Sequence, residues 1–297
     1  MTPPSKTITH TLASASVICA LLLVSLYGSQ TPRSSATTTT PAPPQLSLDP
    51  SLLTARAAIV YNPVTKEILF EKNANERLPL ASLAKLMSAD AVLASQNTGD
   101  LITISAENIR PSGDSGFVVG ERWRVGDLVT FGLVASSNDS MAAAAASLGG
   151  NVVDLMNSRV KELGLTETYF YNPTGLDLDL ETAGAYGSAH DVAIFTAAFL
   201  ENFSTSFEAT ATPTITITSG AHTLEAPSTA APLLSIPGLI GAKTGYTDLA
   251  GGNLVAAFDR EVGQPIIVAV LGSTREGRFE DVKKLIAEVR KLSALQE

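Results

Sequence analysis

The chain has 297 residues, of which 45% are hydrophobic and 16% are charged, a balance typical of a packed globular protein. Its formal net charge is −9 and no stretch concentrates lysine and arginine, so the sequence argues against a nucleic-acid partner. The single cysteine, Cys19, lies in an apolar N-terminal run, so the folded part has no disulfide and no thiolate metal site. Its three histidines are too scattered for a metal-binding motif, and we expect no cofactor.

An uncharged segment near the N-terminus indicates export. Residues 7–28 contain no Asp, Glu, Lys or Arg, and their apolar centre with its polar flanks has about the length that a bilayer needs. A secretory signal peptide would show small residues at a cleavage site, and Tyr27-Gly28-Ser29-Gln30 is a poor match. We therefore expect residues 1–28 to be a membrane anchor, with a cleaved signal peptide as the alternative.

A spacer follows this segment. Residues 29–44 are rich in Ser, Thr and Pro, a composition that cannot bury enough apolar surface to order itself and that prolines stiffen. The sequence therefore predicts a linker over residues 29–47 and one folded domain over residues 48–297. Such a domain would lie outside the cytoplasm, in the periplasm or on the outer face of the cytoplasmic membrane.

The folded domain alternates strand-like and helix-like patterns. A β-hairpin is predicted at residues 57–61 and 67–71, around a turn that contains Asn62-Pro63. Helical spacing predicts helices over residues 82–96, 125–135, 139–148 and 152–163, and from Ser188 to 200. Further strands are predicted over residues 214–218, 239–244, 253–258 and 265–271, before a last helix whose apolar face is Val282, Leu285, Ile286 and Val289.

These elements predict an α+β fold. The first hairpin and the last strands complete one antiparallel sheet covered by helices, and the helices between them form a second, mostly helical lobe. An active site is expected at the seam between the two parts.

Two helix ends carry specific signals: Gly164 is expected to stop one helix, and Ser188 with Asp191 forms a capping box that opens another. Asp191 is therefore given a structural role.

The first chemical motif is Ser82-Leu83-Ala84-Lys85 at a helix start. A spacing of three places both side chains on one helix face, with Cβ atoms about 5–6 Å apart. A neutral lysine amine at that distance can take the proton of the serine hydroxyl as it attacks a carbonyl carbon. Because serine and lysine are common residues, this motif alone does not exceed chance.

Two further motifs are equally ordinary by themselves. Ser136-Ser137-Asn138 lies between two predicted helices and reads simply as an N-cap. Lys243-Thr244-Gly245 lies in a predicted strand and reads as an edge lysine followed by a turn glycine. The three motifs occur in the order S-x-x-K, S-x-N, K-T-G, which is that of penicillin-binding proteins and class A β-lactamases. It is improbable that all three motifs occur by chance in this order, downstream of an export segment.

The surrounding residues narrow the resemblance. Residues 80–89, 163–165, 172–177 (Asn-Pro-Thr-Gly-Leu-Asp) and 241–247 closely resemble the low-molecular-mass D-alanyl-D-alanine carboxypeptidases, over residues 55–292. The resemblance implies a β-lactamase-like serine peptidase fold that trims peptidoglycan stem peptides ending in D-Ala-D-Ala. It also implies covalent inhibition by β-lactams.

The resemblance also implies roles for individual residues. Ser82 would be the acylated nucleophile and Lys85 its base, while Ser136 would relay a proton to the leaving D-alanine. Asn138 would orient the substrate amide, and Lys243 would hold the site electrostatically. Lowering the pKa of Lys85 from its ordinary value to about 7–8 costs roughly 3–5 kcal/mol, which burial and the second cation, Lys243, can supply.

Substrate binding is assigned in the same way to the strand motif. Thr244, beside Gly245, would bind the terminal carboxylate of the peptide, and the backbone N–H groups of Ser82 and Tyr246 would form an oxyanion hole. Arg278 resembles an arginine that precedes the last helix of the family and would join the carboxylate pocket. A solvated helix residue is an equally good interpretation of Arg278.

Four positions depart from the family pattern. Threonine is usual at Ala84, glycine is common at Ser137, histidine is common at Thr174, and a cysteine often stands at Asn253. We expect altered rate and specificity from these differences, and no loss of activity.

Other functions stay open at this point. A D,D-endopeptidase would use the same residues, and a β-lactamase of class A would need a deacylating glutamate, for which Glu167 is the nearest candidate in a poorly matching context. A non-enzymatic β-lactam sensor would be acylated but would turn over slowly. The sequence does not decide between carboxypeptidase and endopeptidase, and it does not give the third residue of the stem peptide.

Overall fold

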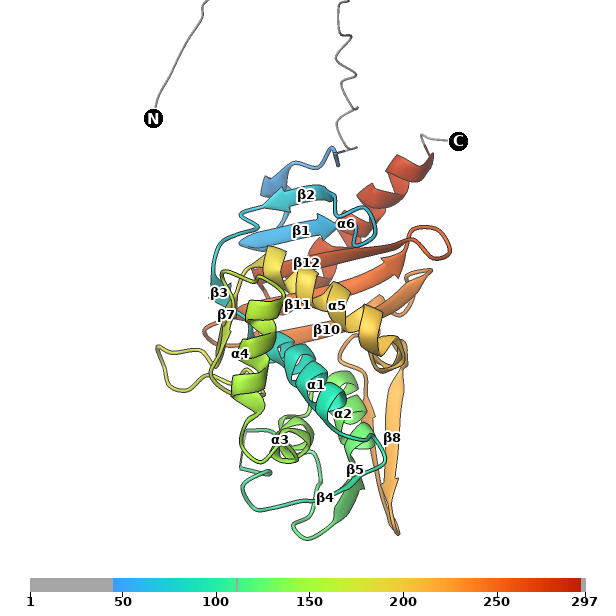
Figure 1. The fold of residues 1–297 in the computed structure, drawn as a ribbon. Coiled ribbons are helices and arrows are strands. Elements are labelled where there is room, and N and C mark those ends of the chain that lie inside the picture. The colour runs from blue at the N-terminus through green and yellow to red at the C-terminus, as the bar shows by residue number, and fades with distance from the viewer. Residues whose placement is uncertain (1–44, 111, 295–297) are drawn as a thin grey trace, which may run out of the picture. The chain divides into compact units, whose positions relative to one another are not determined.

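The computed structural model describes residues 45–110 and 112–294, and its main sheet has five antiparallel strands. In spatial order these are β10 (Leu239–Thr247), β11 (Gly251–Asp259), β12 (Pro265–Ser273), β1 (Ala57–Tyr61) and β2 (Ile68–Lys72). The N-terminal hairpin thus completes a sheet built otherwise from C-terminal strands, as predicted (Figure 1). Strand β10 forms one free edge of this sheet.

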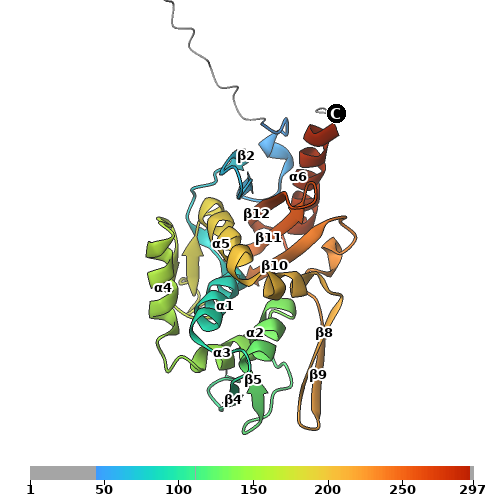
Figure 2. The same cartoon turned by 45° about the vertical axis from the view of Figure 1, so that its right-hand side comes forward.

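Both faces of the main sheet are buried because a helix covers each one (Figures 1 and 2). Ile59 of β1 packs in the core that contains Phe195 of α5 (Ala189–Glu208), whereas its neighbour Val60 packs in the core beneath α6 (Gly277–Ala294). Successive strand residues point to opposite faces, so a strand covered on both sides is apolar throughout. The expected inward residues of the last helix, Val282, Leu285, Ile286 and Val289, are all buried.

The second part of the domain is a helical lobe. Its helices are α1 (Ala84–Ser95), α2 (Val125–Val134), α3 (Asn138–Ala146) and α4 (Val152–Glu162). Helix α1 is preceded by a 3-10 turn, η2 (Ala81–Leu83), and packs against α2, α3, α4 and α5. Every residue from Ala84 to Val92 is buried, so α1 is a rigid central support for whatever lies at its first turn.

The predicted helix ends are partly confirmed. Gly164 adopts a left-handed φ of 69°, and Leu165 N donates to Val160 O at 3.0 Å, which closes the end of α4 as expected. Helix α5 continues to Glu208, beyond the predicted end at residue 200, through a non-helical residue at Phe203 (φ −138°, ψ 44°). Because no glycine or proline marks this kink, the sequence carries no signal for it.

Three small sheets complete the described part of the chain. One has the order β3 (Leu78–Pro79), β7 (Ala185–Gly187) and β6 (Tyr169–Phe170), and the second pairs β4 (Leu101–Thr103) with β5 (Arg122–Arg124). In the third, the predicted strand β8 (Thr214–Ser219) pairs with β9 (His222–Pro227), which the sequence analysis missed.

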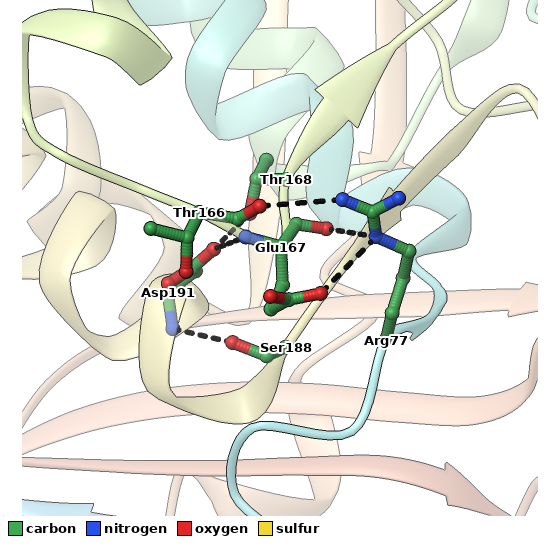
Figure 3. A network of polar contacts seen from close by, with 6 residues as sticks. All are labelled: Arg77, Thr166, Glu167, Thr168, Ser188 and Asp191. Carbon is green, nitrogen blue, oxygen red and sulfur yellow. Dashed lines mark hydrogen bonds and ion pairs between the residues drawn. The ribbon is translucent and has the colours of Figure 1, made fainter.

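Asp191 has the structural role that its motif predicts, with different partners (Figure 3). Ser188 Oγ accepts from Asp191 N at 3.0 Å and caps α5, but Asp191 Oδ2 accepts from Glu167 N at 2.9 Å and Thr168 Oγ1 at 2.8 Å. Arg77 donates to the backbone carbonyl of Glu167 and lies 3.4 Å from its carboxylate. Glu167 is therefore held in a network that ties β6 to α5.

The predicted anchor, residues 1–28, lies outside the described residues, as does most of the linker. Gln45 and Leu46, at the linker's end, already contact β2: Leu46 is buried, and its N–H donates to Leu69 O at 2.9 Å. Within residues 45–110 and 112–294, no helix has the length and apolar character needed to cross a membrane.

Candidate active site

The serine and lysine of the first motif meet at the start of α1. Lys85 Nζ lies 2.7 Å from Ser82 Oγ, 2.7 Å from Asn138 Oδ1 and 2.9 Å from Thr174 O. The Lys85 side chain is fully buried, whereas Ser82 is partly exposed. The turn η2, the first residue of α3 and the loop at Thr174 therefore converge on the amine of Lys85.

The orientation of this amine follows from its neighbours. Asn138 Nδ2 donates to Ser112 O, which turns the amide so that Asn138 Oδ1 faces Lys85 as an acceptor only. The carbonyl of Thr174 is likewise an acceptor. A neutral lysine amine has two N–H donors and one lone pair, so these two acceptors use both donors. The lone pair is then left for the hydroxyl of Ser82.

A second serine and lysine pair lies beside the first. Lys243 Nζ donates to Ser136 Oγ at 2.7 Å and to Thr244 O at 2.8 Å, and its side chain is fully buried. Ser136 has a left-handed φ of 58°, a conformation that costs on the order of 1–3 kcal/mol for a residue with a side chain. Its neighbour Ser137 caps α3 by accepting from Ser140 N, so the N-cap interpretation is correct for Ser137.

Both lysines have lowered pKa values. Burial lowers the pKa of Lys85 to about 7. Burial also lowers the pKa of Lys243 well below its usual range, with smaller contributions from the positive charges of Lys85 and Arg278. The partners of both Nζ atoms are hydroxyl, amide and carbonyl oxygens, so no carboxylate among them holds either proton in place. An uncharged amine near neutral pH is the form that a general base requires.

The free edge of the main sheet passes directly beside Ser82. A Cβ atom placed on Gly245 would lie 3.1 Å from Ser82 N and 2.9 Å from Leu80 O, so the strand and the turn η2 are in backbone contact. The next residue of β10 is Tyr246, whose N–H group is predicted to form the oxyanion hole together with that of Ser82.

The remaining predicted residues lie around this edge. Thr244 Oγ1 donates to Thr229 Oγ1 at 2.8 Å, beside Lys243. Arg278 is 7% exposed, and its Nη1 donates to Gly245 O at 2.6 Å, so it is buried against the strand rather than solvated. Arg278 thus fixes the backbone of β10 next to the reactive serine.

Gly245 provides a direct test of this backbone contact. Gly245→Ala is expected to lower the rate of penicillin acylation by about 10²–10³, the usual cost of one misplaced oxyanion donor. The physical reason is that the new methyl group pushes β10 away from Leu80 O and Ser82 N. Stopped-flow acylation measures the effect, and circular dichroism with thermal unfolding shows whether the variant is folded. An unchanged acylation rate in folded protein would contradict the proposed contact.

Some site residues were not predicted from the sequence. Thr174 contributes only its backbone carbonyl, which no residue type marks, and Thr229 reaches the site from the connection after β9. Two of the departures from the family pattern have local contacts. Ala84 packs against the loop at Gly175, where a Cβ atom placed on the glycine would lie 3.0 Å from Ala84 Cβ, and Asn253 Nδ2 donates to Pro79 O. Neither side chain is among the hydrogen-bond partners of Lys85 Nζ.

Known proteins show the same sequence pattern and fold. The sequence profile of peptidase family S11, D-alanyl-D-alanine carboxypeptidase, matches residues 39–275. The chain belongs to this family. Among S11 relatives, D-alanyl-D-alanine carboxypeptidase DacF of Bacillus subtilis is 31% identical over 242 residues, covering 78% of this chain and 61% of the relative. DacA of Escherichia coli K12 is 30% identical over 269 residues, covering 83% and 61%. The chain thus spans about three fifths of the length of these S11 relatives.

Solved structures confirm the expected fold. Penicillin-binding protein D2 of Listeria monocytogenes, in its cefotaxime-bound form, aligns with a TM-score of 0.71 and 32% identity, covering 80% of this chain and 97% of that chain. Its ampicillin-bound form aligns with the same TM-score at 31% identity. The α+β architecture with a site at the seam is therefore that of penicillin-binding proteins.

Proposed function

We propose that this S11 protein is a serine D-alanyl-D-alanine carboxypeptidase that trims peptidoglycan stem peptides and is acylated by penicillins at Ser82. One observation carries the assignment. Lys85 Nζ lies 2.7 Å from Ser82 Oγ, and in the neutral amine Asn138 Oδ1 and Thr174 O use both N–H donors, which leaves the lone pair for the Ser82 hydroxyl. This is the geometry of a nucleophile with its general base.

The residues perform acyl transfer in two steps. Ser82 Oγ attacks the carbonyl carbon of the penultimate D-alanine, and its proton passes to Lys85 Nζ. The oxygen that becomes negative accepts from the N–H groups of Ser82 and Tyr246. The C–N bond then breaks as Ser136 passes its proton to the nitrogen of the leaving D-alanine and is reprotonated by Lys243, to which it is hydrogen-bonded. Water then attacks the ester carbonyl, its proton returns through Ser136 to Lys243, and Lys85 gives its proton back to Ser82 Oγ as the ester C–O bond breaks.

The C-terminal carboxylate of the substrate is bound by β10, next to the proposed oxyanion hole. The hydroxyl of Thr244 and the amine of Lys243 form a site for the free carboxylate of the last D-alanine, and a bound carboxylate favours the charged form of Lys243 over the neutral form that burial favours. Arg278 supports the backbone at the next residue, Gly245. The surroundings of Glu167 do not favour the deacylating role of a class A β-lactamase glutamate: its carboxylate lies 3.4 Å from Arg77 Nε, and its backbone N–H donates to Asp191 (Figure 3).

A comparison of two peptide ends tests this function. The wild-type protein is expected to cleave the last peptide bond of a stem peptide that ends in D-Ala-D-Ala, with release of D-alanine, at least about tenfold faster than that of the amidated peptide, which releases D-alaninamide, since a hydrogen bond to a charged group contributes roughly 1.5–3 kcal/mol. Thr244→Val should reduce this preference. Equal cleavage of both peptides would favour an endopeptidase, and slow hydrolysis of the penicillin adduct without peptide cleavage would favour a sensor.

We further propose that residues 1–28 tether the domain to the outer face of the cytoplasmic membrane. The support is the uncharged apolar run and the Ser, Thr and Pro-rich spacer that follows it.

A further inference from the structure

The turn between β12 and α6 presents a second arginine at the mouth of the site. The Arg275 guanidinium carbon lies 3.6 Å from the centroid of the Tyr246 ring. Tyr246 is 37% exposed and Arg275 is exposed, so the stacked pair faces solvent. Cation–π stacking of this kind fixes a guanidinium plane while leaving its N–H groups free to bind a ligand.

The position of this turn is set by the strands beneath it. Gly252 of β11 pairs with Tyr246 of β10, and a Cβ atom on Gly252 would lie 2.1 Å from Thr274 O. The backbone of the turn therefore rests on the strand position opposite Tyr246. Thr274 Oγ1 also accepts from Gly277 N at 2.9 Å, which ties the turn to the start of α6.

Arg275 differs from Arg278 in what it binds. Arg278 donates to Gly245 O and is buried, whereas in the described part of the chain no hydrogen bond or ion pair uses the Arg275 guanidinium. Burial lowers the pKa of Arg278, and the charge of Arg275 lowers it further, although Glu276 opposes the effect. An exposed, oriented cation beside other cations is a site for an anion that the protein itself does not supply.

The direction of the substrate along β10 indicates which anion this is. If the last carboxylate binds at Thr244 and the reacting carbonyl lies at the N–H group of Tyr246, the acyl part of the peptide continues past Tyr246. The residue that precedes the two D-alanines then lies nearest the Tyr246 ring and the Arg275 guanidinium.

We propose that Arg275, held on the Tyr246 ring, binds a carboxylate on the side chain of the residue that precedes D-Ala-D-Ala. This inference rests on the proposed function and names its substrate class: stem peptides whose third residue is a diamino diacid rather than lysine. Arg275 is a specificity-determining residue, and its charge adds nothing to the attack of Ser82 itself. Asp248, an exposed residue directly after the end of β10, has a carboxylate that can interact with the ammonium group that both kinds of third residue carry.

Two matched peptides test the proposal. One carries 2,6-diaminopimelate and the other lysine at the third position, so they differ by one carboxylate. Wild-type protein should have a higher kcat/KM for the diaminopimelate peptide, and Arg275→Ala should lower that value by roughly 10- to 100-fold while changing the lysine peptide less than about twofold. Amidation of the side-chain carboxylate should have the same effect as the substitution. Arg124→Ala, an exposed arginine on β5, is the control.

A second measurement separates this proposal from the proposed function. Two penicillins are compared, one whose side chain ends in an amino acid with a free carboxylate and one in which that carboxylate is amidated. Arg275→Ala should slow acylation by the first only, and this holds even if no peptide loses D-alanine. Equal effects on both penicillins, or on both peptides, would overturn the role of Arg275. Absence of D-alanine release from either peptide, with the acylation preference intact, would overturn only the carboxypeptidase assignment.

Discussion

Ser82→Ala is expected to abolish covalent labelling by a fluorescent penicillin and to lower kcat for D-alanine release by roughly 10³- to 10⁶-fold, the range seen when a nucleophile that acts with its base is removed. The reason is specific to this position. Ser82 Oγ is the hydroxyl that lies 2.7 Å from Lys85 Nζ, whereas Ser136 Oγ accepts from Lys243.

Ser95→Ala is the matched control, because Ser95 is an exposed serine at the other end of α1. It should label as the wild type does. Peptide mapping of the adduct by mass spectrometry should locate it on Ser82. Full labelling of the Ser82→Ala protein would exclude Ser82 as the nucleophile.

The acylation rate is expected to fall about tenfold for each pH unit below about 7, because burial lowers the pKa of Lys85 to about 7 and only the neutral amine can accept the Ser82 proton. Lys85→Arg keeps a cation that cannot lose its proton, so it should be inactive at every pH. Penicillin acylation followed from pH 5 to 9 measures both effects. A profile that is flat from pH 5 to 8 would show that Lys85 is not the base.

The same lysine links stability to pH. Its pKa is lower in the folded protein (about 7) than the ordinary 10.5, so between these values the unfolded chain binds more protons and the folded state gains stability as pH rises. Lys85→Met removes this dependence. The unfolding free energy of the wild type, measured relative to that variant by urea titration, should rise by about 2 kcal/mol from pH 7 to pH 9.

The sequence predicts this site well where the geometry is local. Ser82 and Lys85 lie one helical turn apart, so their contact follows from helix geometry even though a 3-10 turn precedes α1. The main sheet was predicted because its strands are apolar and separated by turn residues. The order of the three motifs then placed the chain among the penicillin-binding proteins.

The unpredicted features depend on distant contacts. The carbonyl of Thr174 reaches Lys85 across 89 positions, and nothing in a side chain announces a backbone acceptor. Arg278 gave two equal interpretations because its burial against Gly245 depends on how the turn after β12 lies on the sheet. The kink at Phe203 has no glycine or proline to mark it, and β9 lacks the strong β-branched pattern of its partner β8.

The position of β1 in the main sheet, between β12 and β2, also determines when the protein can finish folding. Ala57 pairs with Leu271, so this strand pair closes a loop of more than two hundred residues. The chain entropy lost in closing so long a loop precedes any gain from the contacts, which makes such pairings slow. During synthesis, which begins at the N-terminus, Ser82 and Lys85 are made long before the residues of β12. The hairpin of β1 and β2 therefore has no partner on the β1 side until β12 is made, and the reactive site is complete only after β10, which carries Lys243, has joined the sheet.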